Sequence, residues 1–234
     1  MSDYFCTFVD KIKKMNRYIL VILACLTCLP MALSAQEEET VLTFGLGATV
    51  EKELPKGFDV AFSYEMELNK HLSRAEQYAL GLQGGYALKP WLHASAGYQY
   101  FRMRTDDEQL PGLTYWEDLH KTFAGIEASV DVNHFTFTVN EQYQWFTPTV
   151  FHLLGSGLAV EYSIPRTPLS IGASADVLND LRQSLHCLQT TYRATLNCDI
   201  DEHHALTLTY VFNRHSFLDS NRGHIVQLAY TFSF

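Results

Sequence analysis

From Thr40 to Phe234 the chain alternates between bulky apolar residues and small or polar residues with a period of two. Successive side chains of a β-strand point to opposite faces, so this period predicts strands with one apolar and one polar face. No stretch between these runs has a convincing helical period. Eleven runs qualify, near residues 40–54, 59–68, 75–88, 92–104, 120–132, 134–146, 149–164, 169–179, 187–198, 205–212 and 223–234.

The connections between these runs alternate in length. The short ones cover 55–57, 89–90, 131–134, 165–168 and 199–203, and the longer ones cover 69–74, 105–119, 179–186 and 214–222. Outer-membrane barrels have short periplasmic turns and longer external loops. The pattern therefore predicts an all-β fold, an antiparallel up-and-down transmembrane β-barrel of 10 to 12 strands. A closed all-antiparallel barrel needs an even number of strands. We therefore expect ten strands, if 40–54 is not an ordinary barrel strand, or twelve, if the chain has one strand more.

The two faces of the predicted strands differ in character. In a membrane-embedded barrel the bulky set faces lipid and the polar set lines the interior. A soluble secreted barrel that binds a ligand would point the bulky set inward, and periodicity does not choose between the two. Aromatic residues near strand ends, such as Tyr64, Trp91 and Trp145, favour the membrane, because Tyr and Trp gather at its interfaces. The expected interior polar residues are Glu65, Glu67, Glu127, Glu161, Asp176 and Arg193. The four glutamates could pair with Arg193 or give a narrow pore a cation preference, although simple filling of the interior is the expected role.

Composition narrows the class of protein. The 234 residues are 47% hydrophobic and 18% charged, which excludes disorder as the main state. A formal charge of −9 opposes binding to nucleic acid. The mean hydropathy of −0.07 is unusual for a helical membrane protein but suits alternating strands.

The first residues have the features of an export signal. Basic residues within 11–17 precede an apolar run over 18–33, and the small residues Ser34 and Ala35 follow. This predicts a signal peptide over 1–35, with Met15 as a possible true start, and a barrel domain over 36–234. The expected location is the outer membrane of a Gram-negative bacterium.

Two cysteines, Cys187 and Cys198, follow the predicted leader. A single strand between them would hold them about 36 Å apart, whereas a disulfide needs Cα atoms within about 7 Å. We therefore predict two free thiols.

The last predicted strand alternates strongly and carries Tyr230, Phe232 and Phe234 on one face. A terminal Phe that closes such a strand resembles the sorting signal recognised by the outer-membrane assembly machinery. An unpaired strand edge can pair with an edge of that machinery before the barrel closes. The expected partners are this machinery and the lipids of the outer membrane.

A family resemblance covers nearly all of 36–234. A first hairpin precedes the sequence Gly97 to Tyr100 after a tight turn, and a long acidic loop leads to a strand beginning at His120. A polar strand with 140–142 and a final strand ending in Phe complete the order. This order resembles the uncharacterised outer-membrane barrels catalogued as domain of unknown function 2490. The resemblance implies an outer-membrane location and no established activity.

Candidate chemistry is sparse. The last long loop holds Asn213, His215 and Ser216, and a Ser with a His at the outer rim is what an outer-membrane lipid hydrolase needs. His203 and His204 stand next to carboxylates, but adjacent strand residues point to opposite faces, so we expect a solvated turn and no metal site. There is no Gly-rich phosphate loop, paired CxxC or nucleophile elbow, so no cofactor is expected. The sequence favours a non-enzymatic barrel, structural or narrow-channel, with the lipid hydrolase and the soluble barrel as alternatives.

Overall fold

The computed structural model describes residues 41–69, 71–106, 114–148, 151–183, 186–214 and 223–234. These residues form eleven strands and two short 3-10 helices, η1 (Pro55–Gly57) and η2 (Leu181–Gln183). No helix in this part of the chain is long and apolar enough to cross a membrane. The strands are β1 (Val41–Leu54), β2 (Phe58–Leu68), β3 (Ala75–Lys89), β4 (Leu92–Asp106), β5 (Thr114–Val132), β6 (Phe135–Thr147), β7 (Phe151–Ser163), β8 (Leu169–Asp180), β9 (His186–Asp199), β10 (His204–Arg214) and β11 (Gly223–Ser233).

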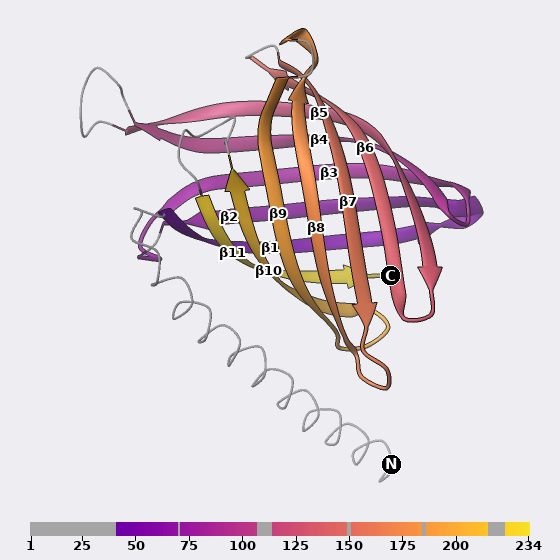
Figure 1. Ribbon diagram of the computed structural model, residues 1–234. Helices are drawn as coiled ribbons and strands as arrows, with labels where there is room; N and C mark the ends of the chain where they lie inside the picture. The colour runs from indigo at the N-terminus through magenta and orange to yellow at the C-terminus, as the bar shows by residue number, and fades with distance from the viewer. Residues whose placement is uncertain (1–40, 70, 107–113, 149–150, 184–185, 215–222) are drawn as a thin grey trace. The chain divides into compact units, whose positions relative to one another are not determined.

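The strands form one closed barrel, in which each strand pairs with its neighbours in sequence and β1 pairs with β11 (Figure 1). The ten consecutive pairs are antiparallel, and the β1–β11 pair is parallel, from Val41 opposite Gly223 to Glu51 opposite Ser233. The predicted all-β barrel of 10 to 12 strands is confirmed. The expected even number is wrong: the run 40–54 is a full strand, and eleven strands close because one pair is parallel.

The barrel has two different ends. The turn end carries η1 and the short turns at 90–91, 133–134, 164–168 and 200–203. Its tight turns need left-handed backbone, which Lys56, Gly57, Asn133 and Arg166 adopt with φ between 57° and 81°. The loop end is the opposite end, where β2, β4, β6, β8 and β10 end and β3, β5, β7, β9 and β11 begin. The parallel β1–β11 pair places the start of β1 at the loop end and the end of β11 at the turn end.

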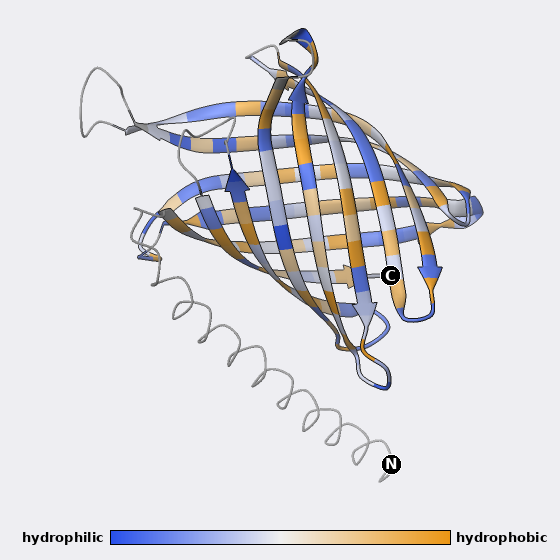
Figure 2. Ribbon diagram, in the orientation of Figure 1, coloured by the Kyte–Doolittle hydropathy of each residue, from blue (hydrophilic) through white to orange (hydrophobic). Residues whose placement is uncertain are grey.

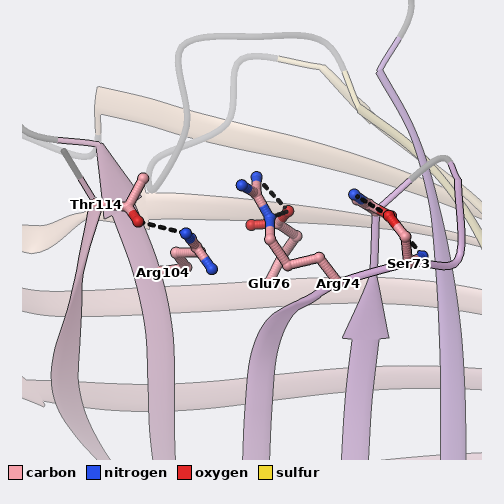
Figure 3. Close-up of polar contacts among 6 residues, drawn as sticks. Ser73, Arg74, Glu76, Arg104 and Thr114 are labelled. Carbon is pink, nitrogen blue, oxygen red and sulfur yellow. Dashed lines mark hydrogen bonds and ion pairs between the residues drawn. The ribbon is translucent and has the colours of Figure 1, made fainter. Parts of the chain in front are cut away.

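The loop predicted over 105–119 is shorter in the structure. β4 and β5 remain paired as far as Asp106 opposite Thr114, whereas β6 pairs with β5 only from His120 onward. The β4–β5 hairpin therefore extends beyond its neighbour at the loop end. Figure 3 shows polar contacts at this end, where an Arg104 nitrogen donates to Thr114 and Arg74 pairs with Glu76 at 2.8 Å.

The strand alternation separates two faces of the wall, visible in Figure 2 as changing colours along each strand. Gln83 on β3 and Arg193 on β9 line the same cavity although their strands are far apart in the barrel order, so their face is the inward one. The opposite face carries exposed apolar side chains, for example Leu82, Ile126 and Leu158 at 54%, 53% and 62% exposure. The barrel therefore has a polar inside and an apolar outside.

The two cysteines lie on β9 and are free thiols, Cys187 exposed and Cys198 buried. The two thiols are free, as predicted, because both cysteines lie far apart along the same strand.

Candidate functional site

A polar cavity of about 510 Å³ lies inside the barrel. Strands β3 to β9 contribute to its wall, which is rich in charged and amide side chains. A volume of this size is within the range of small-molecule sites in proteins. The residues used below are Lys121, Glu127, Gln142, Asp176, Gln189 and Arg193.

The wall of this cavity contains an ion pair between the Arg193 guanidinium on β9 and the Asp176 carboxylate on the neighbouring strand β8. The sequence suggested one of four glutamates as the partner of Arg193. The register explains the difference, because Arg193 lies opposite Ser174, so that Asp176 occupies the diagonal position on the neighbouring strand. Diagonal pairs on one face of a sheet are within reach of long side chains.

Amide and hydroxyl groups continue the polar wall. The Gln144 amide donates to the Gln142 carbonyl oxygen at 2.7 Å. The Thr191 hydroxyl donates to the Asn213 carbonyl oxygen at 2.8 Å, and the Gln189 amide donates to the same oxygen at 3.2 Å. The cavity is thus lined by groups that can both donate and accept hydrogen bonds.

The four predicted interior glutamates alternate in phase with the inward face. Glu127 lines the cavity, and Glu161 accepts a long hydrogen bond of 3.5 Å from Asn197. Glu65 and Glu67 stand on β2 in phase with Ser63, which faces Gly81. Within the described residues, none of the four has a basic side-chain nitrogen within 4.0 Å.

Lys121 is a charged residue of the cavity wall that the sequence analysis did not select. Its ammonium nitrogen lies 5.3 Å from the ring centroid of Phe101 and 5.5 Å from that of Phe123. The alternation along β5 could have found it, since Lys121 shares a phase with Glu127. One of its two ring contacts comes from Phe101 on the neighbouring strand, which the sequence alone does not show.

Of the three residues proposed for a lipid hydrolase, only Asn213 is among the described residues. His215 and Ser216 lie outside the described residues. Asn213 faces inward and is held by Thr191, whereas His224 faces outward and contacts the Tyr210 hydroxyl. The structure therefore offers no observation in favour of the hydrolase.

His203 and His204 have separate partners at the turn end. The Nδ1 atom of His203 lies 2.8 Å from the Ser233 carbonyl oxygen, and that of His204 contacts the Tyr230 hydroxyl. The described residues contain no group of three or more His, Cys, Asp or Glu side chains that could hold a metal ion.

The outward face carries pairs of Tyr and His on neighbouring strands near the loop end. Tyr98 and His120 are joined by a hydrogen bond of 2.6 Å. The same contact joins Tyr143 to His152, whose ring also stacks on Trp145. Aromatic side chains with a polar tip suit an interface between an apolar and an aqueous phase. At the turn end, the rings of Phe58 and Tyr86 lie 4.6 Å apart on the outward face, and Trp91 in the β3–β4 turn is exposed.

The sequence matches no protein-family model and no curated protein. Several solved structures are similar in fold. The NanC porin has a TM-score of 0.50 at 9% identity, with 79% of this chain and 94% of that chain covered. LpxR from Salmonella typhimurium has a TM-score of 0.52 at 9% identity, with 78% and 84% covered. The fold is that of an outer-membrane β-barrel. At 9% identity the likeness extends to the fold alone.

Proposed function

We propose that this chain is an outer-membrane β-barrel of a Gram-negative bacterium with a non-enzymatic role, and that its interior is a narrow passage for small hydrophilic solutes. The observation that carries the proposal is the polarity of the wall. Apolar side chains cover the outside, and charged and amide side chains enclose a cavity of about 510 Å³ inside.

The outward face supports a membrane location over the soluble alternative. A soluble ligand-binding barrel needs its bulky side chains inside, but Leu82, Val130 and Leu158 are more than half exposed on the outside. Contiguous apolar surface of this kind on a water-soluble protein would promote aggregation, whereas lipid covers it without cost. The Tyr–His pairs and the aromatic residues of the turn end match the two interfaces of a bilayer. The outer-membrane lipids are the proposed partners of this surface.

The interior supports a narrow passage. Barrels of about eight strands are filled by their side chains, and those of 16 to 18 strands contain wide aqueous channels. Eleven strands stand between these cases. The inward carboxylates, amides and the Asp176–Arg193 pair offer hydrogen bonds to a hydrated solute, which is how selective pores replace part of its hydration shell.

The last strand supports a partner during assembly. Tyr230 and Phe232 alternate on the outward face of β11, Phe234 follows the end of that strand, and the rings of Phe232 and Phe234 lie 5.7 Å apart. We propose that the assembly machinery binds this strand before β1 pairs with it. Membership of the domain of unknown function 2490 family is part of the same proposal.

The location is tested by fractionating cells that express the full chain and running the envelope protein on a gel with and without heating. We expect outer-membrane recovery and a band that shifts on heating, as a closed barrel gives. A soluble periplasmic protein would overturn the membrane location.

The passage is tested by reconstituting the barrel in liposomes and measuring sorbitol-driven swelling. We expect swelling with the native protein and a strong reduction with Gln142→Trp, which fills the cavity. Val139→Trp, on the outward face of the same strand, is the matched control and should leave the rate unchanged. Liposomes that stay impermeable with a correctly folded native barrel would overturn the passage and leave a structural role.

A further inference from the structure

The cavity contains a positive charge that no described carboxylate contacts directly. Two cations line the cavity among the described residues, Lys121 and Arg193. Arg193 is paired with Asp176. Lys121 has no carboxylate within 4.0 Å and no hydrogen bond to any described residue.

Two aromatic rings lie close to the Lys121 ammonium. Its ammonium lies between the rings of Phe101 and Phe123, at 5.3 Å and 5.5 Å from their centroids. Phenyl faces attract a cation, but they provide neither a hydrogen-bond acceptor nor a full negative charge. An ammonium that has aromatic rings but no carboxylate in contact can form a direct ion pair with an anionic group that enters the cavity.

Other groups of the same wall complement the rest of such a solute. The amides of Gln142 and Gln189 and the hydroxyl of Thr191 line the cavity beside the two cations. Amides and hydroxyls donate to and accept from the hydroxyl groups of a polar molecule. The cavity therefore combines a cation that no carboxylate contacts with amide and hydroxyl groups.

The acidic residues of the interior do not occupy the same position. Glu127 lies six residues from Lys121 on β5, which places their Cα atoms about 20 Å apart along the strand. Asp176 is already bound to Arg193. Glu65 on β2 attracts the Lys121 ammonium across the interior, but its carboxylate is not within 4.0 Å of that nitrogen. The Lys121 ammonium is thus attracted by Glu65 but has no carboxylate in direct contact among the described residues.

We propose that Lys121 is the anion-binding residue of a solute site in the barrel, and that the site takes a small hydroxylated carboxylate. The carboxylate binds the Lys121 ammonium between the two phenyl rings, and the hydroxyl groups bind the amides of the wall. This proposal deepens the proposed function, on which it rests for the access of the solute to the cavity.

Gluconate and sorbitol are matched probes, because they have the same carbon chain length and differ in the carboxylate. Binding of each to the native full-length barrel in detergent micelles is measured by calorimetry. We expect saturable binding of gluconate and at least tenfold weaker binding of sorbitol. Equal binding of the two probes, or no binding of either, would overturn the site.

Three variants localise the effect. Lys121→Met keeps an unbranched side chain that is one atom shorter and removes the charge. We expect it to weaken gluconate binding at least tenfold with no change for sorbitol. Lys121→Arg should restore most of the gluconate affinity. Lys52→Met is the matched control, because its ammonium lies 4.4 Å from the ring centroid of Phe234 on the outward face at the turn end. Undiminished gluconate binding by a Lys121→Met barrel that keeps its heat-shifted band would overturn the role of Lys121.

The micelle measurement separates this proposal from the proposed function. If the site fails but the passage exists, native liposomes swell in sorbitol while gluconate does not bind. If the passage fails but the site exists, gluconate binds in micelles while liposomes remain impermeable.

Discussion

The two faces of β6 use neighbouring residues for opposite purposes. Phe137 and Val139 point outward and are each 49% exposed, whereas Asn140 and Gln142 point inward and line the cavity. In a water-soluble domain the apolar set would form the core and the polar set would be solvated. Here the polar set is enclosed by protein and the apolar set is outside. Stability then depends on strand pairing and on the outer surface, while the chemistry of the molecule is inside.

The outward face also carries charged residues, and one of them, Glu141, lies between two inward residues of β6. Its carboxylate accepts a hydrogen bond of 2.9 Å from the Ser156 hydroxyl on β7, and both side chains face outward. A carboxylate on a lipid-facing wall is costly, although less so than a basic residue. The comparison of the two faces can therefore be tested by adding a charge to the outward face and by removing one from it.

The largest expected effect comes from placing a charge on each face of β6. Val139→Arg puts a guanidinium on the apolar outside and should destabilise the barrel by about 2–4 kcal/mol if the position is close to the middle of the bilayer. Thr138→Arg puts the same group on the polar inside and should cost less than about 1 kcal/mol. Urea unfolding in lipid vesicles, followed by tryptophan fluorescence, measures both. Equal losses would mean that the two faces share one environment.

Glycine positions give the next largest contrast. A Cβ at Gly97, on the inside, would lie 2.5 Å from both the Leu82 carbonyl oxygen and the Phe123 ring. Gly97→Ala should therefore cost about 1–3 kcal/mol, the usual range for overpacking. At Gly84, on the outside, the nearest atom to a Cβ is the Asp59 carbonyl oxygen at 3.9 Å, so Gly84→Ala should be neutral. The same unfolding assay decides, and a loss at Gly84 as large as at Gly97 would contradict the contrast.

These contrasts also show what the sequence could predict. Each run of alternating residues corresponds to a strand, because the alternation is a local property that each strand displays independently. The prediction of an even number of strands was wrong. The parallel pairing of β1 with β11 joins residues 182 positions apart, such as Glu51 and Ser233, and this pairing leaves no local signal in the sequence.

The sequence predicts which side chains face the interior, but it does not predict which of them contact one another. The inward phase of the carboxylates and of Arg193 follows from the alternation. The partner of Arg193 depends on the register between β8 and β9, which places Asp176 at the diagonal position. Lys121 was not selected, because its importance comes from Phe101 on the neighbouring strand as much as from β5 itself.

Ion pairs on the two faces give a smaller effect. Asp176→Asn leaves Arg193 without its partner inside the barrel and should cost about 1–2 kcal/mol, between the values for exposed and for fully buried pairs. On the outside, Arg102 and Asp118 are 3.7 Å apart and both about half exposed, so Asp118→Asn should change stability by less than about 0.5 kcal/mol. Thermal unfolding in micelles compares them. A larger loss for Asp118→Asn would contradict the ranking, and Asp176→Asn combined with Arg193→Gln should recover part of the first loss.

Replacement of the outward carboxylate of Glu141 should give the smallest change in stability, and this change should be a gain rather than a loss. If lipid surrounds this part of the wall, Glu141→Leu should stabilise the barrel in vesicles by up to about 1 kcal/mol, because it removes a charge from an apolar surface at the expense of the hydrogen bond to Ser156. Gln142→Leu, one residue away and inside, should give no gain. A loss of stability with Glu141→Leu, together with a smaller particle on native gels, would mean that this stretch of wall contacts protein instead of lipid. The carboxylate would then be part of an interface, and the apolar outside would be divided between lipid and a partner.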